Sequence, residues 1–296
     1  MQGLKTYFKR IPFFVYLYKK YVVYSGKLRF YKNKVMCRVY SEEDLCRMFS
    51  KIGISPGDRV FIHSSMSKIG VLKDGPITFV NALKKIIGKD GLIVMPTFPS
   101  KSSYDYLTNY KTFEVKKTPS INGAITEFFR TSDGVFRSIH PTHPIAAWGK
   151  DAENLMKGHE KTKSMFDENS PFKRLIDLNI KILLVGVNFD HMTMMRVIED
   201  TYDKCMINPY CEKKFYVDVI GYDDESIQVE TNCHDPEYFG LNRENMQLYP
   251  YLENNICLGY IGQAKTMLIN SQDMYSKQIE CCNKGIYPYR KYRFKK

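Results

Sequence analysis

Two histidines, each followed by a proline, are the first candidates for chemistry in this 296-residue chain. His140 and His143 both directly precede a proline. Proline fixes its own φ and pushes the preceding residue toward extended geometry, so we expect both histidines in extended rather than helical backbone. A rigid extended segment can direct an imidazole into a cleft, where it could transfer a proton near neutral pH. The alternative is an ordinary turn with one solvated and one packed histidine.

A second candidate is the hydroxyl-rich loop over residues 63–70, which follows an apolar run. Hydroxyl and backbone N–H groups in such a loop can hold a pyrophosphate. An ordinary polar loop explains the same residues.

A third group follows the apolar run 181–186. Thr193, Arg196 and Glu199 recur every third residue, which would place them on one face of a helix. The alternative for Arg196 and Glu199 is a surface ion pair, which would contribute little to stability.

All three groups are close to segments expected to form buried strands. Apolar runs at 58–63, 91–95 and 181–186, with a helical pattern over 79–87 between the first two, are typical of a sheet covered on both faces. Ligands of open α/β sheets bind beyond the carboxyl ends of the strands. The sequence therefore predicts an α/β fold with its candidate residues at that edge.

Residues 98–120 are polar and irregular, long enough for a functional loop rather than a connector. The remaining predicted elements are strands at 215–220 and 257–261 and helices at 45–52, 123–130, 151–157, 172–178, 194–198, 235–247 and 274–281.

Charge divides the chain into three parts. Residues 1–40 carry ten of the 44 Lys and Arg residues and residues 283–296 carry six, with no acid in either part. The rest holds 28 basic and 32 acidic residues, a net charge of −4, which argues against a nucleic-acid-binding body. We expect a basic aromatic arm over 1–40, a folded domain over 41–282 and a basic tail over 283–296. The arm could contact an anionic membrane surface or pack on the body.

The eight cysteines contain no C-x-x-C pair, so we predict reduced cytosolic thiols and no metal site. No apolar run reaches the roughly eighteen residues of a membrane span.

Short blocks spread over residues 41–282 resemble the aminoglycoside 3-N-acetyltransferases and their relatives outside antibiotic resistance. The blocks occur in family order, and together they are far more specific than any one of them. They are His-Ser-Ser at 63–65 with Ile-Gly at 69–70, Gly-Leu-Ile-Val-Met-Pro-Thr-Phe at 91–98, Thr-Pro-Ser at 118–120, Arg-Ser-Ile-His-Pro-Thr-His at 137–143, Ala-Ala-Trp-Gly at 146–149, His-Glu at 159–160, Ser-Pro-Phe at 170–172, Leu-Leu-Val-Gly-Val at 183–187, and Thr193 with Glu199 and Asp200.

The resemblance implies a central mixed sheet flanked by helices, and direct transfer of an acetyl group from acetyl-CoA to a small-molecule amine. It implies His140 as the base, Thr193 close to the thioester and Glu199 as the acid, and it places His143, Glu168 and Arg196 with the acceptor. The residues implied for CoA are His63, Ser64, Ser65, Ser67, Lys68, Ile69, Gly70 and Thr97.

The chain departs from the family pattern at Pro144 (usually serine), at Arg196 (usually histidine), and at Asp167 and Asn169 (usually glycines). A permanent cation at 196 would repel a polycationic aminoglycoside and favour an anionic group. The sequence thus predicts a cytosolic N-acetyltransferase acting on an amino sugar, as in the synthesis of a surface polysaccharide. The alternatives are an aminoglycoside 3-N-acetyltransferase conferring antibiotic resistance and a catalytically degenerate scaffold. The sequence leaves open the acceptor, the acyl chain length and the oligomeric state.

Overall fold

The computed structural model describes residues 38–291. The basic aromatic arm predicted over 1–40 lies almost wholly outside the described residues, as does the end of the predicted tail, 292–296. The predicted membrane contact of the arm therefore stays a prediction. Within residues 38–291, no helix has both the length and the apolar character that crossing a membrane requires.

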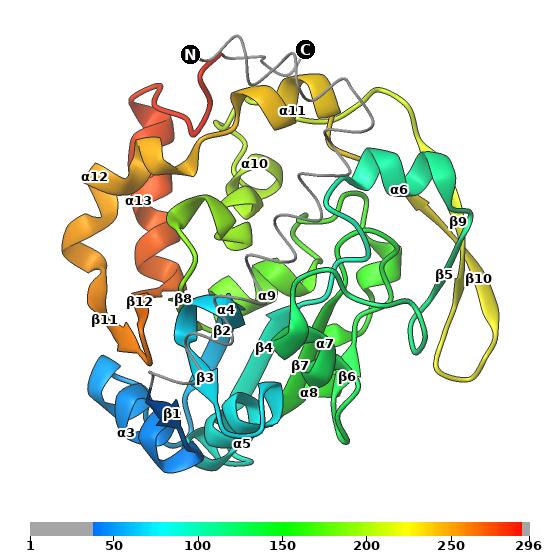
Figure 1. Cartoon of the computed structure of the whole chain (residues 1–296). Coiled ribbons are helices and arrows are strands. Elements are labelled where there is room, and N and C mark those ends of the chain that lie inside the picture. The colour runs from blue at the N-terminus through cyan, green and yellow to red at the C-terminus, as the bar shows by residue number, and fades with distance from the viewer. Residues whose placement is uncertain (1–37, 292–296) are drawn as a thin grey trace, which may run out of the picture.

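A mixed sheet forms the centre of the molecule (Figure 1). Its middle strand, β2, runs parallel to both neighbours, β4 and β8, whereas the strands farther out pair antiparallel. The predicted α/β class and its three buried strands are confirmed. In spatial order, the strands of this sheet within the described residues are β11 (Cys257–Ile261), β12 (Ala264–Asn270), β8 (Lys181–Val185), β2 (Arg59–Ser64), β4 (Leu92–Pro96), β7 (Ile145–Gly149) and β6 (Phe136–Arg137).

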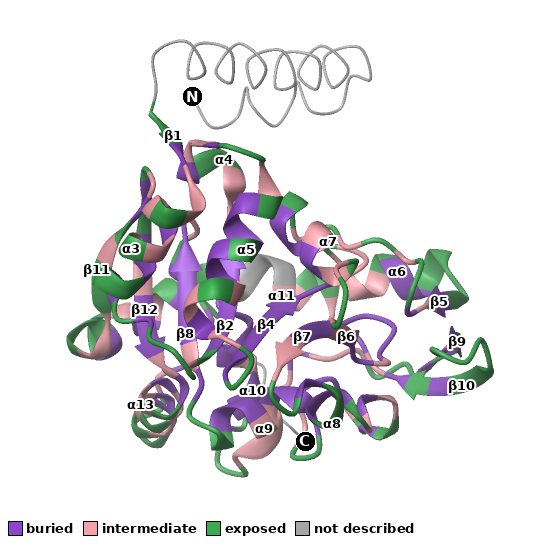
Figure 2. Ribbon diagram, turned by 90° about the horizontal axis from the view of Figure 1, so that it is seen from below, coloured by how far each residue is buried: buried purple, intermediate pink, exposed green. Residues whose placement is uncertain are grey.

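Strand β2 shows why the sheet is covered on both faces. Val60 and Ile62 pack into one apolar cluster and Phe61, between them, packs into another; all three are fully buried. Successive side chains of a strand point to opposite faces, so a strand that is apolar throughout needs cover on both. Figure 2 shows β8 and β4 coloured as buried in the middle of the molecule.

Helices whose apolar side chains pack against Val60 and Ile62 cover one face. The first, α3, begins at a capping box: Asp44 N donates to Ser41 Oγ (3.2 Å), and Ser41 N donates to the Asp44 carboxylate (3.1 Å). It ends at Gly53, whose φ of 107° lies in the left-handed region that glycine adopts readily. The helices of this face are α3 (Glu42–Ile52), α5 (Pro76–Ile87) and α7 (Ala124–Arg130).

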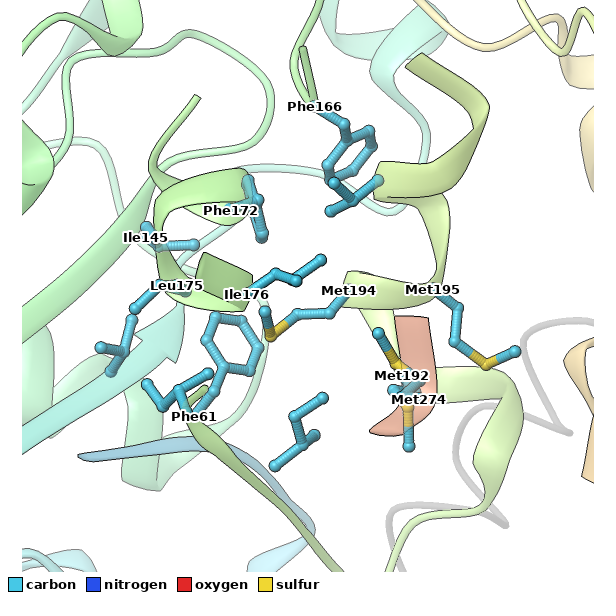
Figure 3. Packing of buried hydrophobic residues seen from close by; sticks show 14 of the residues in the cluster. Phe61, Ile145, Phe166, Phe172, Leu175, Ile176, Met192, Met194, Met195 and Met274 are labelled. Atoms are coloured by element: carbon cyan, nitrogen blue, oxygen red, sulfur yellow. The ribbon is translucent and has the colours of Figure 1, made fainter. Parts of the chain in front are cut away.

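The opposite face is packed around Phe61 (Figure 3). The ring centroids of Phe61 and Phe172 lie 6.1 Å apart, and those of Phe166 and Phe172 lie 4.8 Å apart. Burying a side chain of this size completely contributes roughly 1.5–3 kcal/mol. The helices with residues in this cluster are α8 (Ala152–Met156), α9 (Pro171–Asp177), α10 (Val197–Thr201), α12 (Tyr249–Leu252) and α13 (Ser271–Asn283).

A smaller sheet replaces much of the irregular loop expected over 98–120. That stretch contains α6 (Ser103–Asn109) and β5 (Thr112–Glu114), and β5 pairs with β9 (Phe215–Ile220), which pairs with β10 (Ser226–Thr231). Tyr106 and Phe113 pack with Phe215 in a separate apolar cluster. The expectation of an irregular conformation was wrong because the apolar partners of this stretch lie about a hundred residues away along the chain.

Packing also extends past both ends of the predicted domain 41–282. Tyr40 in β1 (Val39–Tyr40), which pairs with β3 (Val71–Leu72), is buried, and so are Tyr287 and Tyr289. The predicted helices over 194–198 and 235–247 are partly 3-10 turns. The short elements are α4 (Met66–Ile69), α11 (Pro236–Asn242) and 3-10 turns at His159–Lys161, Phe189–His191, Thr193–Arg196, Asn245–Leu248 and Glu253–Asn255.

Candidate active site

A cavity of about 980 Å³ opens at the carboxyl ends of β2, β4 and β8. The segments that leave these strands contribute to its wall, which is the edge at which the sequence predicted a site. Residues from α6, α7 and α11 complete the wall. The lining residues are His63, Ser64, Ser65, Met66, Ser67, Phe98, Ser100, Lys101, Ser102, Ser103, Asp105, Ile121, Asn122, Gly123, Ala124, Ile125, His143, Val187, Asp190, His191, Thr193, Arg196, His234, Pro236 and Phe239.

The hydroxyl-rich loop lies at the end of β2 and is tied to the neighbouring strand. Ser65 N donates to Val185 O (2.9 Å), and the hydroxyls of Ser65 and Ser67 lie 3.3 Å apart. Of the eight residues predicted for CoA, this loop brings His63, Ser64, Ser65 and Ser67 to the cavity. Their role in binding CoA stays a prediction.

The other four predicted CoA residues do not line the cavity. Lys68 lies against Gly186, Ile69 is buried in the core beneath the helices, and Gly70 lies beside the Tyr40 ring. Thr97 is buried, where its Oγ1 donates to Pro144 O (3.0 Å).

Thr97 belongs instead to a group of contacts that positions the histidine segment. Arg137 Nε donates to Thr97 Oγ1 (3.0 Å), and its guanidinium also donates to the carbonyl oxygens of Val115 (3.1 Å) and Thr118 (2.6 Å). Burial lowers the pKa of Arg137 to about 9, and the carbonyl oxygens satisfy its N–H groups. These bonds fasten the start of the histidine segment to the loops around β4 and β5.

His140 is buried behind the cavity wall rather than on it. Its Nδ1 accepts hydrogen bonds from the backbone N–H groups of Thr142 (3.2 Å) and His143 (3.1 Å), so it carries no proton there. Its ring stacks on His159 with centroids 4.4 Å apart. Burial lowers the pKa of His140 to about 3. The imidazole therefore shapes the turn, and its role as base stays a prediction.

His143 is the histidine of this segment that reaches the cavity. Its Nδ1 lies 3.0 Å from Thr142 Oγ1, its Nε2 lies 3.4 Å from an Arg196 guanidinium nitrogen, and its ring contacts Phe98. Guanidinium can only donate, so Nε2 accepts and the proton is on Nδ1. Burial, with smaller effects of His234 and Arg196, lowers the pKa of His143 well below its usual value.

Thr193 lies on the cavity wall and starts a 3-10 turn rather than an α-helix. Its backbone N–H donates to His63 Nε2 (3.4 Å), which joins the ends of β2 and β8. Burial lowers the pKa of His63 to about 3, and His191 and Arg196 act in the same direction.

Arg196 and Glu199 do not form the ion pair that was the alternative interpretation of their spacing. Glu199 is buried and bonds to Arg243 Nη1 and to the Tyr289 hydroxyl (2.9 Å), outside the cavity lining. The 3-10 turn at Thr193–Arg196 gives way to α10 at Val197, so the three side chains do not share the face of one continuous helix. The predicted acid is thus the partner of a buried arginine.

Arg196 itself lies on the cavity wall, stacked on an aromatic ring. Its guanidinium carbon is 4.6 Å from the Phe239 ring centroid and 6.0 Å from that of Phe166. Burial and the charge of Arg243 lower the pKa of Arg196 to about 10, so it stays a cation at neutral pH. Glu168, the third residue predicted for the acceptor, pairs with Lys173 (3.4 Å) away from the lining.

The sequence predictions missed several cavity residues. His234 follows β10 and stacks on Tyr210 and Phe239, with centroids 5.0 and 4.1 Å away. The acids Asp105 and Asp190 also line the cavity. No local pattern connects these residues with the histidine segment. Within residues 38–291, no three His, Cys, Asp or Glu side chains are grouped as a metal ion would require.

Comparison with known proteins identifies the family to which this sequence is similar. The family model described as aminoglycoside 3-N-acetyltransferase matches residues 61–282, three quarters of the chain. The SPbeta prophage-derived aminoglycoside N(3')-acetyltransferase-like protein YokD of Bacillus subtilis (strain 168) is 27% identical over 176 residues, 54% of this chain and 64% of that protein. Aminoglycoside N(3)-acetyltransferase VII of Streptomyces paromomycinus is 27% identical over 173 residues, 54% of this chain and 60% of that protein. The matches thus span less than two thirds of these two relatives.

Solved structures match over a larger share of their length. AAC-VIa bound to sisomicin is 25% identical and has a TM-score of 0.72, and its alignment covers 84% of this chain and 99% of that one. AAC-IIIb, solved as a binary complex with CoASH, is 21% identical, with a TM-score of 0.71 over 84% and 98%. The mixed sheet with its flanking helices is therefore the fold of these acetyltransferases.

Proposed function

Because the chain belongs to the aminoglycoside 3-N-acetyltransferase family, we propose that it transfers an acetyl group from acetyl-CoA to the amine of a small-molecule acceptor. The amine nitrogen attacks the thioester carbonyl, the C–S bond breaks, and the proton lost by the amine goes to a base. The products are an N-acetyl amide and free CoA.

The observation that carries this proposal is one cavity that joins a hydroxyl-rich loop to an uncharged imidazole. Ser64, Ser65 and Ser67 supply donors on the side of β2, and His143 and Thr193 contribute from other segments. Hydroxyl and N–H donors suit the phosphates of CoA, and they also suit the thioester oxygen, which gains charge in the transition state. A relative with the same fold is known as a complex with CoASH, which supports the choice of donor.

The base is one of the two histidines of the segment 137–144. His143 lines the cavity, and among the described residues its Nε2 accepts a bond only from Arg196, so a displaced guanidinium would free it for a proton. His140 is buried and is not among the lining residues, and its Nδ1 is occupied by backbone donors. Position thus favours His143 over the predicted His140 for direct contact with the acceptor, since a base must come within hydrogen-bond reach of the proton it takes.

The comparisons support an aminoglycoside acceptor, the alternative drawn from the sequence, and give no support to an amino sugar of polysaccharide synthesis. The carboxylates of Asp105 and Asp190 in the cavity wall suit a cationic amine. An aminoglycoside is therefore the first acceptor to test.

The test combines calorimetric titration with CoA and measurement of CoA thiol release from acetyl-CoA in the presence of sisomicin. We expect CoA binding and sisomicin-dependent thiol release. A matched pair of variants, Ser67→Ala in the cavity loop and Ser132→Ala at a partly buried serine outside the cavity, should weaken CoA binding only in the first. Absence of CoA binding by the intact protein would contradict the proposal and favour the degenerate scaffold.

A further inference from the structure

Arg196 is a partly buried cation that, among the described residues, no carboxylate contacts directly. Among the described residues, no Asp or Glu oxygen lies within 4 Å of its guanidinium, and its Nε is buried with no hydrogen-bond partner. Its one polar contact in this part of the chain is the uncharged His143 (3.4 Å). Removing part of a charged group from water is costly unless the charge is paired, so an anion bound here would be favourable.

The two other buried arginines in this part of the protein differ from Arg196. Arg137 donates to three carbonyl oxygens and to a threonine hydroxyl, and Arg243 is paired with the Glu199 carboxylate. Neither lines the cavity. Of these three arginines, Arg196 is thus the one that lines the space available to a ligand.

A second unpartnered nitrogen lies on the same wall. His234 is 5% exposed, and its Nε2 is buried without a hydrogen-bond partner among the described residues. Phe239 brings the two residues together, because its ring packs against the His234 ring (4.1 Å) and under the Arg196 guanidinium (4.6 Å). A guanidinium and an imidazole N–H are both donors that match the oxygens of a carboxylate, phosphate or sulfate.

We propose that Arg196 and His234 form an anion subsite for a carboxylate, phosphate or sulfate group carried by the acceptor. This rests on the proposed function, since it names the class of acceptor that the same cavity takes: an amine that also bears an anionic group.

The subsite is coupled to the candidate base. Arg196 donates to His143 Nε2, the nitrogen that would take a proton from the acceptor. An anion that binds the guanidinium both competes for this N–H group and neutralises the positive charge that opposes protonation of His143. An acceptor that carries an anion therefore helps to prepare its own base, whereas a purely cationic acceptor such as sisomicin should be acetylated with a lower kcat/KM.

The test compares two acceptors that differ only in the anion, glucosamine and glucosamine 6-phosphate, by CoA thiol release. We expect kcat/KM for the phosphate ester to exceed that for glucosamine by about tenfold or more in the parent protein. Arg196→Met should reduce this ratio to roughly twofold or less, and Arg196→Lys should leave an intermediate ratio. Arg290→Met, at an exposed arginine paired with Glu244, is the matched control and should keep the parent's ratio.

Thermal unfolding tests whether the subsite binds an anion, without requiring turnover. With CoA saturating and ionic strength constant, inorganic phosphate in place of chloride should raise the melting temperature of the parent by roughly 2–4 °C, and that of Arg196→Met by less than about 1 °C. If phosphate stabilises only the CoA-free protein, the subsite belongs to CoA and the proposal is wrong. Equal kcat/KM for the two acceptors would overturn the anion subsite while leaving the acetyltransferase function intact, whereas failure of CoA to bind would overturn the proposed function itself.

Discussion

Replacing His140 by asparagine and by alanine separates its structural role from a catalytic one. In both histidine and asparagine, an acceptor atom is attached to Cγ, so the side-chain Oδ1 introduced by His140→Asn can take the place of Nδ1. The backbone N–H groups of Thr142 and His143 would keep their acceptor in His140→Asn and lose it in His140→Ala.

The magnitude follows from those two bonds. Leaving one buried N–H unsatisfied costs about 1–3 kcal/mol, so we expect the loss of both bonds in His140→Ala to lower the free energy of unfolding by about 2–6 kcal/mol. His140→Asn should lower it by about 1 kcal/mol, mainly through the lost stacking on His159. His191, which is exposed, provides the control: His191→Ala should change stability by less than about 0.5 kcal/mol.

Urea unfolding measures these differences, and CoA thiol release measures turnover of the asparagine variant. If His140 is the base, His140→Asn should fold, bind CoA and lose about 10²-fold or more in kcat. If it only shapes the turn, the asparagine variant should keep its turnover while the alanine variant unfolds easily. An alanine variant as stable as the parent would refute the reasoning from the two N–H groups.

Three further predictions concern acid stability, the buried ion pair and the basic arm. His63 and His140 have a folded pKa of about 3 against an ordinary 6.5, so the unfolded chain binds protons that the folded chain does not. These two histidines alone should make the free energy of unfolding fall by about 2.7 kcal/mol per pH unit below about pH 6, seen as a falling urea midpoint. The lowered pKa values of His143, His159 and His234 act in the same direction, and a midpoint constant down to about pH 5 would contradict this. Glu199→Leu should lower the free energy of unfolding by about 3–5 kcal/mol, because it leaves the Arg243 charge buried without its carboxylate, and adding Arg243→Met should recover most of that loss. A double variant no more stable than Glu199→Leu would argue against the ion pair. Deleting residues 1–34, with nine positive charges, should abolish sedimentation with anionic vesicles at low salt and leave the fold intact, whereas loss of folding would show that the arm packs on the body.

The amino-acid sequence alone was sufficient to predict the class of fold and the residues on one side of the cavity. The apolar runs that became β2, β4 and β8 are local features, and the capping box at Ser41 with Gly53 defines α3 without reference to any other segment. Loops that directly follow such strands are placed by the strands themselves. The sequence therefore located His63 and Ser64 to Ser67 at the cavity, and the order of short blocks indicated the family.

Other parts of the site were decided by tertiary contacts between segments far apart in the chain. His234 reaches the cavity because the strands β5, β9 and β10 pair across about a hundred residues, and nothing near position 234 marks it. The spacing of Arg196 and Glu199 predicted neighbours, yet a 3-10 turn and the charge of Arg243 separate them. The spacing of two residues gives only their separation along the chain. Which group pairs with a buried charge depends on which side chains the whole fold brings into contact with it.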